Sequence, residues 1–213
     1  WVSFQDPLPA WNFQLDVDTL YCLALIGAEG MLEALCLQGA DVNAQNSINS
    51  GSALHAACLK GRTRSVKLLL DHRADSGLAA QRDLTPLHLS SSPQVVELLC
   101  QHRCDLEPKD SKGQTPLHHA ATLARASVVS ALLSCRADVN TMTNTLETPL
   151  HLAAASGDAA ALEVVKVLSA ADADLALVSG VSGLDALGIA RKIGARDMTE
   201  FLLECSLQLG QID

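Results

Sequence analysis

Histidine and cysteine are the residues of this 213-residue chain that could carry chemistry, and each occurs seven times. A cysteine activated by a histidine can attack an acyl group, and the two residue types together can hold zinc. Four histidines, however, recur behind a leucine at steps of 30 to 33 residues: His55, His88, His118 and His151. A side chain repeated at this period is expected to belong to a scaffold, and not to a catalytic centre.

A second group of candidate ligands contains Cys100, His102, Cys104 and the more distant Cys135. Cys100 and His102 would point in different directions on a helix, and no second pair has the spacing of zinc ligands. We therefore expect structural thiols, with no metal and no cofactor. The odd number of cysteines and the lack of a Cys-x-x-Cys motif favour a reducing compartment, which predicts a cytoplasmic or nuclear location.

Other signs of catalysis or of nucleic-acid and membrane binding are missing from the sequence. It has no Gly-rich phosphate loop, no HExxH and no GxSxG motif, so an enzyme is not predicted. The net charge of −9 argues against a general nucleic-acid binder. No apolar run reaches the roughly 18 residues that cross a bilayer. The charge is uneven, because residues 60–136 hold eleven basic and seven acidic residues between acidic ends.

The histidines belong to a repeated motif that must position them. Thr-Pro-Leu-His begins at Thr85, Thr115 and Thr148, with a degenerate copy at Ser52 and weaker copies at Asp18 and Asp185. Thr or Ser can cap a helix, and Pro suits the first helical position. A second motif with Asp follows five of the copies, at Ala40, Ala74, Cys104, Ala137 and Ala173.

These two motifs, kept in phase, resemble the ankyrin repeat family over about residues 16–207. The resemblance implies an all-α ankyrin-repeat solenoid of about six helix-turn-helix repeats with short β-hairpin-like loops, in which the motif histidines link neighbouring repeats. The expected repeats are 16–48, 49–81, 82–111, 112–144, 145–181 and 182–207, between an aromatic capping segment at 1–15 and a tail at 208–213. Five of the six aromatic residues lie in the first 21 positions. They either cap the first repeat or form a docking site or a join to another domain.

Departures from the repeat length predict local differences in structure. Repeat three lacks three residues around Ser90–Pro93, so we expect a stunted first helix and a notch in the inner surface. Repeat five has three additional residues within Asp158–Leu162, which predict a longer turn or an extra helical turn. The loops at Asn46–Gly51 and Ser179–Gly183 each carry about one extra residue.

A stacked array presents loop tips and first helices as one extended concave face for another protein. Within this chain the loop-tip residues vary between copies while the motif residues do not. The predicted partner-binding residues are Gln81, Arg82, Leu84, Leu89, Ser111, Lys112, Gln114, His119, Asn144, Leu146, Glu147 and Leu152. Leu84 and Leu146 are either binding hot spots or packing between loops. His119 is either a ligand contact or a solvated histidine.

Two further sets of residues depart from a purely structural pattern. Arg73, Arg103 and Arg136 stand where the family usually has a left-handed Gly, so they either offset a helix dipole or form a basic ladder for an acidic partner.

Asn43 and Asn140 resemble the family pattern that an asparaginyl hydroxylase modifies. The alternative is an Asn that hydrogen-bonds the loop backbone.

The sequence therefore predicts a monomeric, non-catalytic module that binds a protein or peptide segment. One role is an adaptor or scaffold, such as substrate recognition for a ubiquitin ligase of the ankyrin-plus-SOCS-box type, although no segment here matches a SOCS box. A second is a sequestering inhibitor of a regulatory or transcription factor. A third is a structural domain of a larger multidomain protein.

Overall fold

The computed structural model describes residues 17–208, and within them the chain forms eleven α-helices, one short 3₁₀ turn and no strand. The helices are α1 Val17–Ile26, α2 Glu29–Leu37, α3 Ala53–Leu59, α4 Thr63–Asp71, α5 Pro93–Gln101, α6 Pro116–Thr122, α7 Ala126–Ser134, α8 Pro149–Ser156, α9 Ala159–Ala170, α10 Ala186–Ile193 and α11 Arg196–Gln208, and the 3₁₀ turn is η1 Gln81–Asp83. The predicted aromatic segment 1–15 and residues 209–213 lie outside the described residues.

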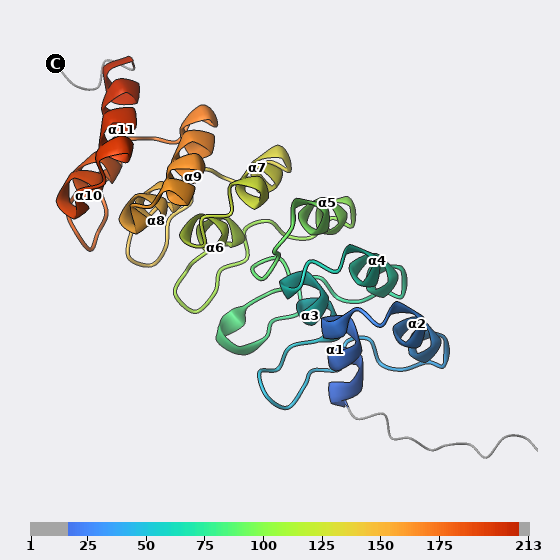
Figure 1. Ribbon diagram of the computed structural model, residues 1–213. Helices are drawn as coiled ribbons and strands as arrows, with labels where there is room; N and C mark the ends of the chain where they lie inside the picture. The colour runs from blue at the N-terminus through green and yellow to red at the C-terminus, as the bar shows by residue number, and fades with distance from the viewer. Residues whose placement is uncertain (1–16, 209–213) are drawn as a thin grey trace, which may run out of the picture.

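The helices form two rows that run the length of the array (Figure 1). One row holds α1, α3, α6, α8 and α10, and the other holds α2, α4, α5, α7, α9 and α11. The loops between repeats extend together from the side of the first row. Contacts follow this order, since α1 packs on α3, α6 on α8 and α8 on α10. The predicted all-α solenoid of helix-turn-helix repeats is confirmed.

The motif leucines and the alanines that follow them form the core between the rows. Leu54, Leu117 and Leu150 are at most 1% exposed, and the Ala pairs behind them are buried as well. Small side chains let neighbouring first helices approach closely, while the apolar faces of the second helices close the core from the other side. One repeat cannot bury these faces alone, so the stability of the fold comes from stacking.

Three of the four motif histidines join two repeats. The Nδ1 of each of the four accepts the backbone N–H of the Ser or Thr that caps its own helix, at 3.1 Å. Nε2 therefore carries the proton and donates to a backbone carbonyl. For His55, His88 and His118 the acceptors are Leu84, Gln114 and Glu147 of the following repeat, at 2.9 to 3.1 Å. The repeat-linking role that the resemblance implied is confirmed for these three, whereas His151 donates to Leu177 of its own repeat at 2.9 Å.

The first helix of repeat three is reduced to a single turn over residues 86–89. Neighbouring repeats satisfy the backbone groups at its end. The Ser91 N–H donates to the Cys58 carbonyl of repeat two at 3.2 Å, and the Arg125 guanidinium of repeat four donates to the Ser90 carbonyl at 3.1 Å. Ser92 then caps α5. The predicted stunted helix is confirmed.

The additional residues of repeat five form an extra helical turn. Helix α9 has 12 residues, whereas α4, α5 and α7 have 9 each. Asp158 caps α9 by accepting the Ala161 N–H at 2.7 Å. The two longer loops are also present: their closing N–H and C=O groups lie five residues apart, from Asn46 to Gly51 and from Ser179 to Leu184, instead of four.

Acid should destabilise this array through the motif histidines. Burial lowers the pKa of all four, to about 4 for His88 and His118, from an ordinary value of 6.5. The neutral rings are favoured in the fold, so their contribution is complete above pH 6.5 and is lost as the pH falls toward 4. We expect a loss of about 2 kcal/mol for each of His88 and His118 by pH 5, measured by urea unfolding between pH 7 and pH 5.

The control for this prediction is the exposed His102. His102→Gln should leave both the stability at pH 7 and its pH dependence unchanged. His118→Gln should lower the free energy of unfolding at pH 7 and flatten its pH dependence. A wild-type chain equally stable at pH 7 and pH 5 would contradict the assignment.

Candidate partner-binding surface

The loop tips form one continuous edge along the array. Each tip is closed by a backbone hydrogen bond across its base and is joined to the next tip by another. The joining N–H···O bonds run from Gln81 to Asn49, from Ser111 to Arg82, from Asn144 to Lys112 and from Gly180 to Thr145, at 3.0 to 3.2 Å. Side chains on consecutive tips therefore stand at fixed positions relative to one another.

The predicted partner-binding residues divide into two groups on this edge. The exposed group comprises Gln81, Arg82, Ser111, Lys112, Asn144 and Leu146. The half-buried group comprises Leu84, Leu89, Gln114, His119, Glu147 and Leu152. Three of the half-buried residues, Leu84, Gln114 and Glu147, also accept the motif-histidine bonds through their carbonyls. The two predicted leucines differ: Leu146 is 55% exposed, whereas Leu84 is half-buried.

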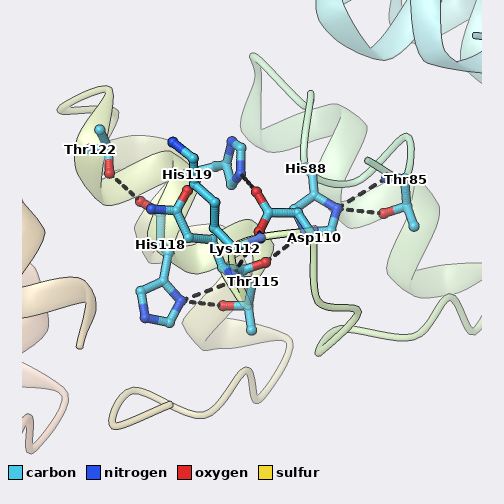
Figure 2. A network of polar contacts seen from close by, with 9 residues as sticks. Thr85, His88, Asp110, Lys112, Thr115, His118, His119 and Thr122 are labelled. Atoms are coloured by element: carbon cyan, nitrogen blue, oxygen red, sulfur yellow. Dashed lines mark hydrogen bonds and ion pairs between the residues drawn. The ribbon is translucent and has the colours of Figure 1, made fainter. Parts of the chain in front are cut away.

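His119 is paired with a buried carboxylate (Figure 2). Its Nε2 lies 2.9 Å from Asp110 Oδ2, and its side chain is only 22% exposed. Asp110 Oδ1 accepts the backbone N–H groups of Lys112 and Gln114, at 2.8 Å each. Burial by itself would raise the pKa of Asp110, but these hydrogen bonds outweigh it and hold the pKa below its usual value. His119 thus fixes the loop tip that carries Lys112.

A hollow of about 260 Å³ opens between the loop tips of repeats two and three, beside the one-turn first helix of repeat three. Tyr21, Leu59, Leu84 and Leu89 line it with apolar surface. Asn49, Gln81 and Arg82 are among the residues that complete it. Because residues 90–93 do not line this hollow, the notch expected from the missing residues stays a prediction. Tyr21 and Leu59 were not predicted here, because they come from repeats one and two and only the stacking brings them to repeat three.

Arg73, Arg103 and Arg136 are exposed, with left-handed φ angles of 64°, 57° and 73°. Each stands directly after the C-cap residue of α4, α5 or α7, at equivalent places in three consecutive repeats. Within residues 17–208 none of them forms an ion pair. The left-handed conformation predicted for these positions is confirmed. Whether they form a basic ladder for a partner stays a prediction.

Asn43 and Asn140 lie in the turns that follow second helices, and each side chain bonds to the equivalent turn of the following repeat. The Asn43 side-chain oxygen accepts the Asp75 N–H at 2.8 Å, and Asn140 does the same for Asp174 at 2.9 Å. Glu107 occupies the corresponding place in repeat three and accepts the Asp138 N–H at 2.9 Å. The amides therefore hydrogen-bond the loop backbone of the next repeat. Their hydroxylation stays a prediction.

Three of the thiols, those of Cys58, Cys100 and Cys104, are poorly suited to nucleophilic chemistry. Burial raises the pKa of Cys58 and Cys100, and it raises that of Cys104 to about 11, so these side chains stay protonated at neutral pH. Over residues 17–208, no group of three or more His, Cys, Asp or Glu is arranged to hold a metal ion. In the same part of the chain, no helix is both long and apolar enough to cross a membrane.

Comparison with known proteins gives a consistent family match. The family model described as ankyrin repeats (3 copies) matches residues 20–110, 74–143 and 90–179. Ankyrin repeat and SOCS box protein 16 of Mus musculus is 40% identical over 60 residues, which are 28% of this chain and 13% of that protein. Ankyrin repeat and SOCS box protein 11 of Danio rerio is 33% identical over 76 residues, 36% of this chain and 25% of that protein.

Two other matches extend the comparison. Inversin of Mus musculus is 40% identical over 72 residues, 34% of this chain and 7% of that protein. The chain thus spans a quarter or less of the length of these three relatives. The crystal structure of EF0377, an ankyrin repeat protein, matches with a TM-score of 0.78 at 20% identity, over 88% of this chain and 97% of that one. This last likeness concerns the fold alone.

The left-handed arginines give a stability prediction. Arg103→Gly and Arg103→Ala both remove the cation, but only Gly adopts a positive φ without strain. We expect the Gly variant to be about 1 kcal/mol more stable than the Ala variant in urea unfolding. Glu97 is an exposed position inside α5 and serves as the control. There the Ala variant should be more stable than the Gly variant by a similar amount. An Ala variant at position 103 as stable as the Gly variant would contradict the strain.

Proposed function

Because the chain belongs to the ankyrin repeat family, whose repeats are protein-interaction modules, we propose that it binds a protein partner and catalyses no reaction. The partner occupies the loop tips and first helices of repeats three to five. The observation that carries this proposal is the continuous edge of hydrogen-bonded tips, on which Arg82, Lys112 and Leu146 are exposed.

The mechanism is complementarity to a preformed surface. The closing bonds, the tip-to-tip bonds and the motif-histidine bonds fix the backbone beneath the contact residues before a partner arrives. Little backbone ordering is then needed on binding, so more of the contact energy contributes to affinity. The raised pKa of the buried Cys58 and Cys104 thiols supports a role in which these side chains are structural.

Within this class we propose an adaptor or scaffold that brings a protein client to a larger assembly. Two of the relatives are named as ankyrin repeat and SOCS box proteins, which supports substrate recognition for a ubiquitin ligase as the specific role. The aligned segments cover a quarter or less of each relative, which also suits a domain of a larger multidomain protein. We propose that the module is monomeric and acts in the cytoplasm or nucleus.

A sequestering inhibitor is the second candidate, and the acidic ends of the chain favour it. Residues 1–59 contain six acidic residues and no Lys or Arg, which suits the basic segment of a regulatory or transcription factor. The two roles differ in what accompanies the partner. An adaptor co-purifies with a client and with the assembly that acts on it, whereas an inhibitor co-purifies with its target alone.

Affinity capture from a cell lysate, read by mass spectrometry, tests the binding surface. We expect a quadruple Ala variant at exposed loop-tip positions (Arg82, Lys112, Asn144 and Leu146) to lose at least tenfold of the captured partner, because interface energy concentrates in few contacts. The matched control replaces four exposed residues of the second row, Lys67, Gln94, Glu97 and Ser130, with Ala. Equal thermal melts verify folding. Equal capture by both variants would contradict the proposed surface.

A further inference from the structure

The hollow beside repeat three is a concave, mainly apolar part of the loop-tip edge. Tyr21, Leu59, Leu84 and Leu89 line it with apolar surface. Leu89 is the last residue of the one-turn first helix of repeat three, after which the chain turns to Ser92 and α5. The His55 bond to the Leu84 carbonyl links the walls that come from repeats two and three.

Hydrogen bonds hold the walls of this hollow in place. The Gln81 N–H donates to the Asn49 carbonyl at 3.0 Å, and the Gln81 side-chain amide donates to the Ile48 carbonyl at 2.9 Å. The Asn49 side chain lies 3.4 Å from the Tyr21 hydroxyl. The rim is therefore tied to the backbone on two sides, while the apolar side chains between these bonds are left to contact an occupant.

The surroundings of the hollow are basic. Arg82 lines it and is exposed, and Lys112 stands exposed on the next tip. The Ser111 N–H joins that tip to the Arg82 carbonyl at 3.0 Å.

Most of the nearby carboxylates are already engaged. Asp110 is buried and bonded to His119, and Asp18 accepts from the Ser47 backbone and hydroxyl at 3.2 and 3.3 Å. Asp83 is the exposed acid beside Arg82. Arg82 and Lys112 are thus the exposed cations on the two joined tips at the apolar space, with Asp83 as the exposed acid beside them.

We propose that this hollow, which we call the repeat-three pocket, receives a large apolar side chain from an acidic segment of the protein partner. The segment carries Leu, Ile, Met or an aromatic residue flanked by Asp or Glu. The apolar side chain fills the space among Tyr21, Leu59, Leu84 and Leu89, and the flanking carboxylates lie against Arg82 and Lys112. This inference rests on the proposed function, because it names the chemistry of the partner segment at the same face.

In this arrangement the apolar contact contributes mainly to affinity, and the charges contribute mainly to selectivity. Desolvation of the anchor supplies most of the affinity, since a buried anchor in a pocket is the usual hot spot of an interface. The cations at the rim stay in solvent, so each contributes modestly and loses strength as salt rises. They select acidic flanks over basic ones by repelling like charge.

The experiment selects short random peptides displayed on phage against the whole folded chain. Synthetic copies of the enriched peptides are then titrated by fluorescence anisotropy. We expect the enriched sequences to share an apolar or aromatic residue with acidic neighbours. Enrichment of basic or purely polar peptides, or no enrichment at all, would overturn the proposal.

Two matched pairs of variants locate the binding of those peptides. Leu89 and Leu98 are both half-buried leucines of repeat three, but Leu98 lies on α5 in the second row and does not line the pocket. Leu89→Asp should weaken binding at least tenfold, because it places an unpaired charge in the apolar space, whereas Leu98→Asp should leave binding unchanged, with thermal melts verifying that both variants fold. Equal weakening by the two variants would overturn the assignment of the pocket.

Arg82 and Arg103 form the second pair, since both are exposed and left-handed, with φ angles of 63° and 57°. Arg82→Gln should weaken binding about fivefold at low salt, and Arg103→Gln should have no effect. If Arg103→Gln weakened binding and Arg82→Gln did not, the acidic segment would bind at the basic ladder of Arg73, Arg103 and Arg136 instead. If lysate capture still depends on the loop tips while no peptide uses this pocket, the inference fails and the proposed function stands.

Discussion

One hydrogen bond, from the Nε2–H of a motif histidine to a carbonyl in the following repeat, underlies the stacking of repeats two to five. The Nδ1 of the same ring accepts from its own helix cap, which requires a neutral ring, and burial favours that state. The acceptors Leu84, Gln114 and Glu147 stand at the bases of the loops, so the bond that joins two repeats also sets the position of the tips above it. Scaffold and binding surface are thus positioned by the same contact.

The shortened first helix of repeat three is accommodated by its neighbours. Removing a turn from a first helix would ordinarily leave backbone groups without partners, at a cost of about 1–3 kcal/mol each. Here the Ser91 N–H donates to the Cys58 carbonyl, and Arg125 donates to the Ser90 carbonyl, so the adjacent repeats satisfy these groups. Leu89, the last residue of the shortened helix, then lines the repeat-three pocket.

Much of the fold could be predicted from the sequence, because the period of Thr-Pro-Leu-His determines helix starts, caps and stacking together. The missing turn of repeat three and the longer loops also followed from counting residues.

The site could be predicted only in part. Whether Asp158–Leu162 lengthened a turn or a helix depends on the cap that Asp158 forms. The partner of His119 is Asp110, nine positions earlier in the sequence, and only the closed loop brings the two side chains together. Tyr21 and Leu59 reach the pocket only through stacking.

The central claim is that the tips and first helices of repeats three to five, and not the second row of helices, contact the partner. Amide hydrogen exchange of the chain alone and bound to its captured partner tests this claim most directly. The account predicts added protection in residues 80–92, 110–119 and 143–152, with α4, α5 and α7 unchanged. Protection confined to the second row, or to the turns that carry Arg73, Arg103 and Arg136, would contradict it.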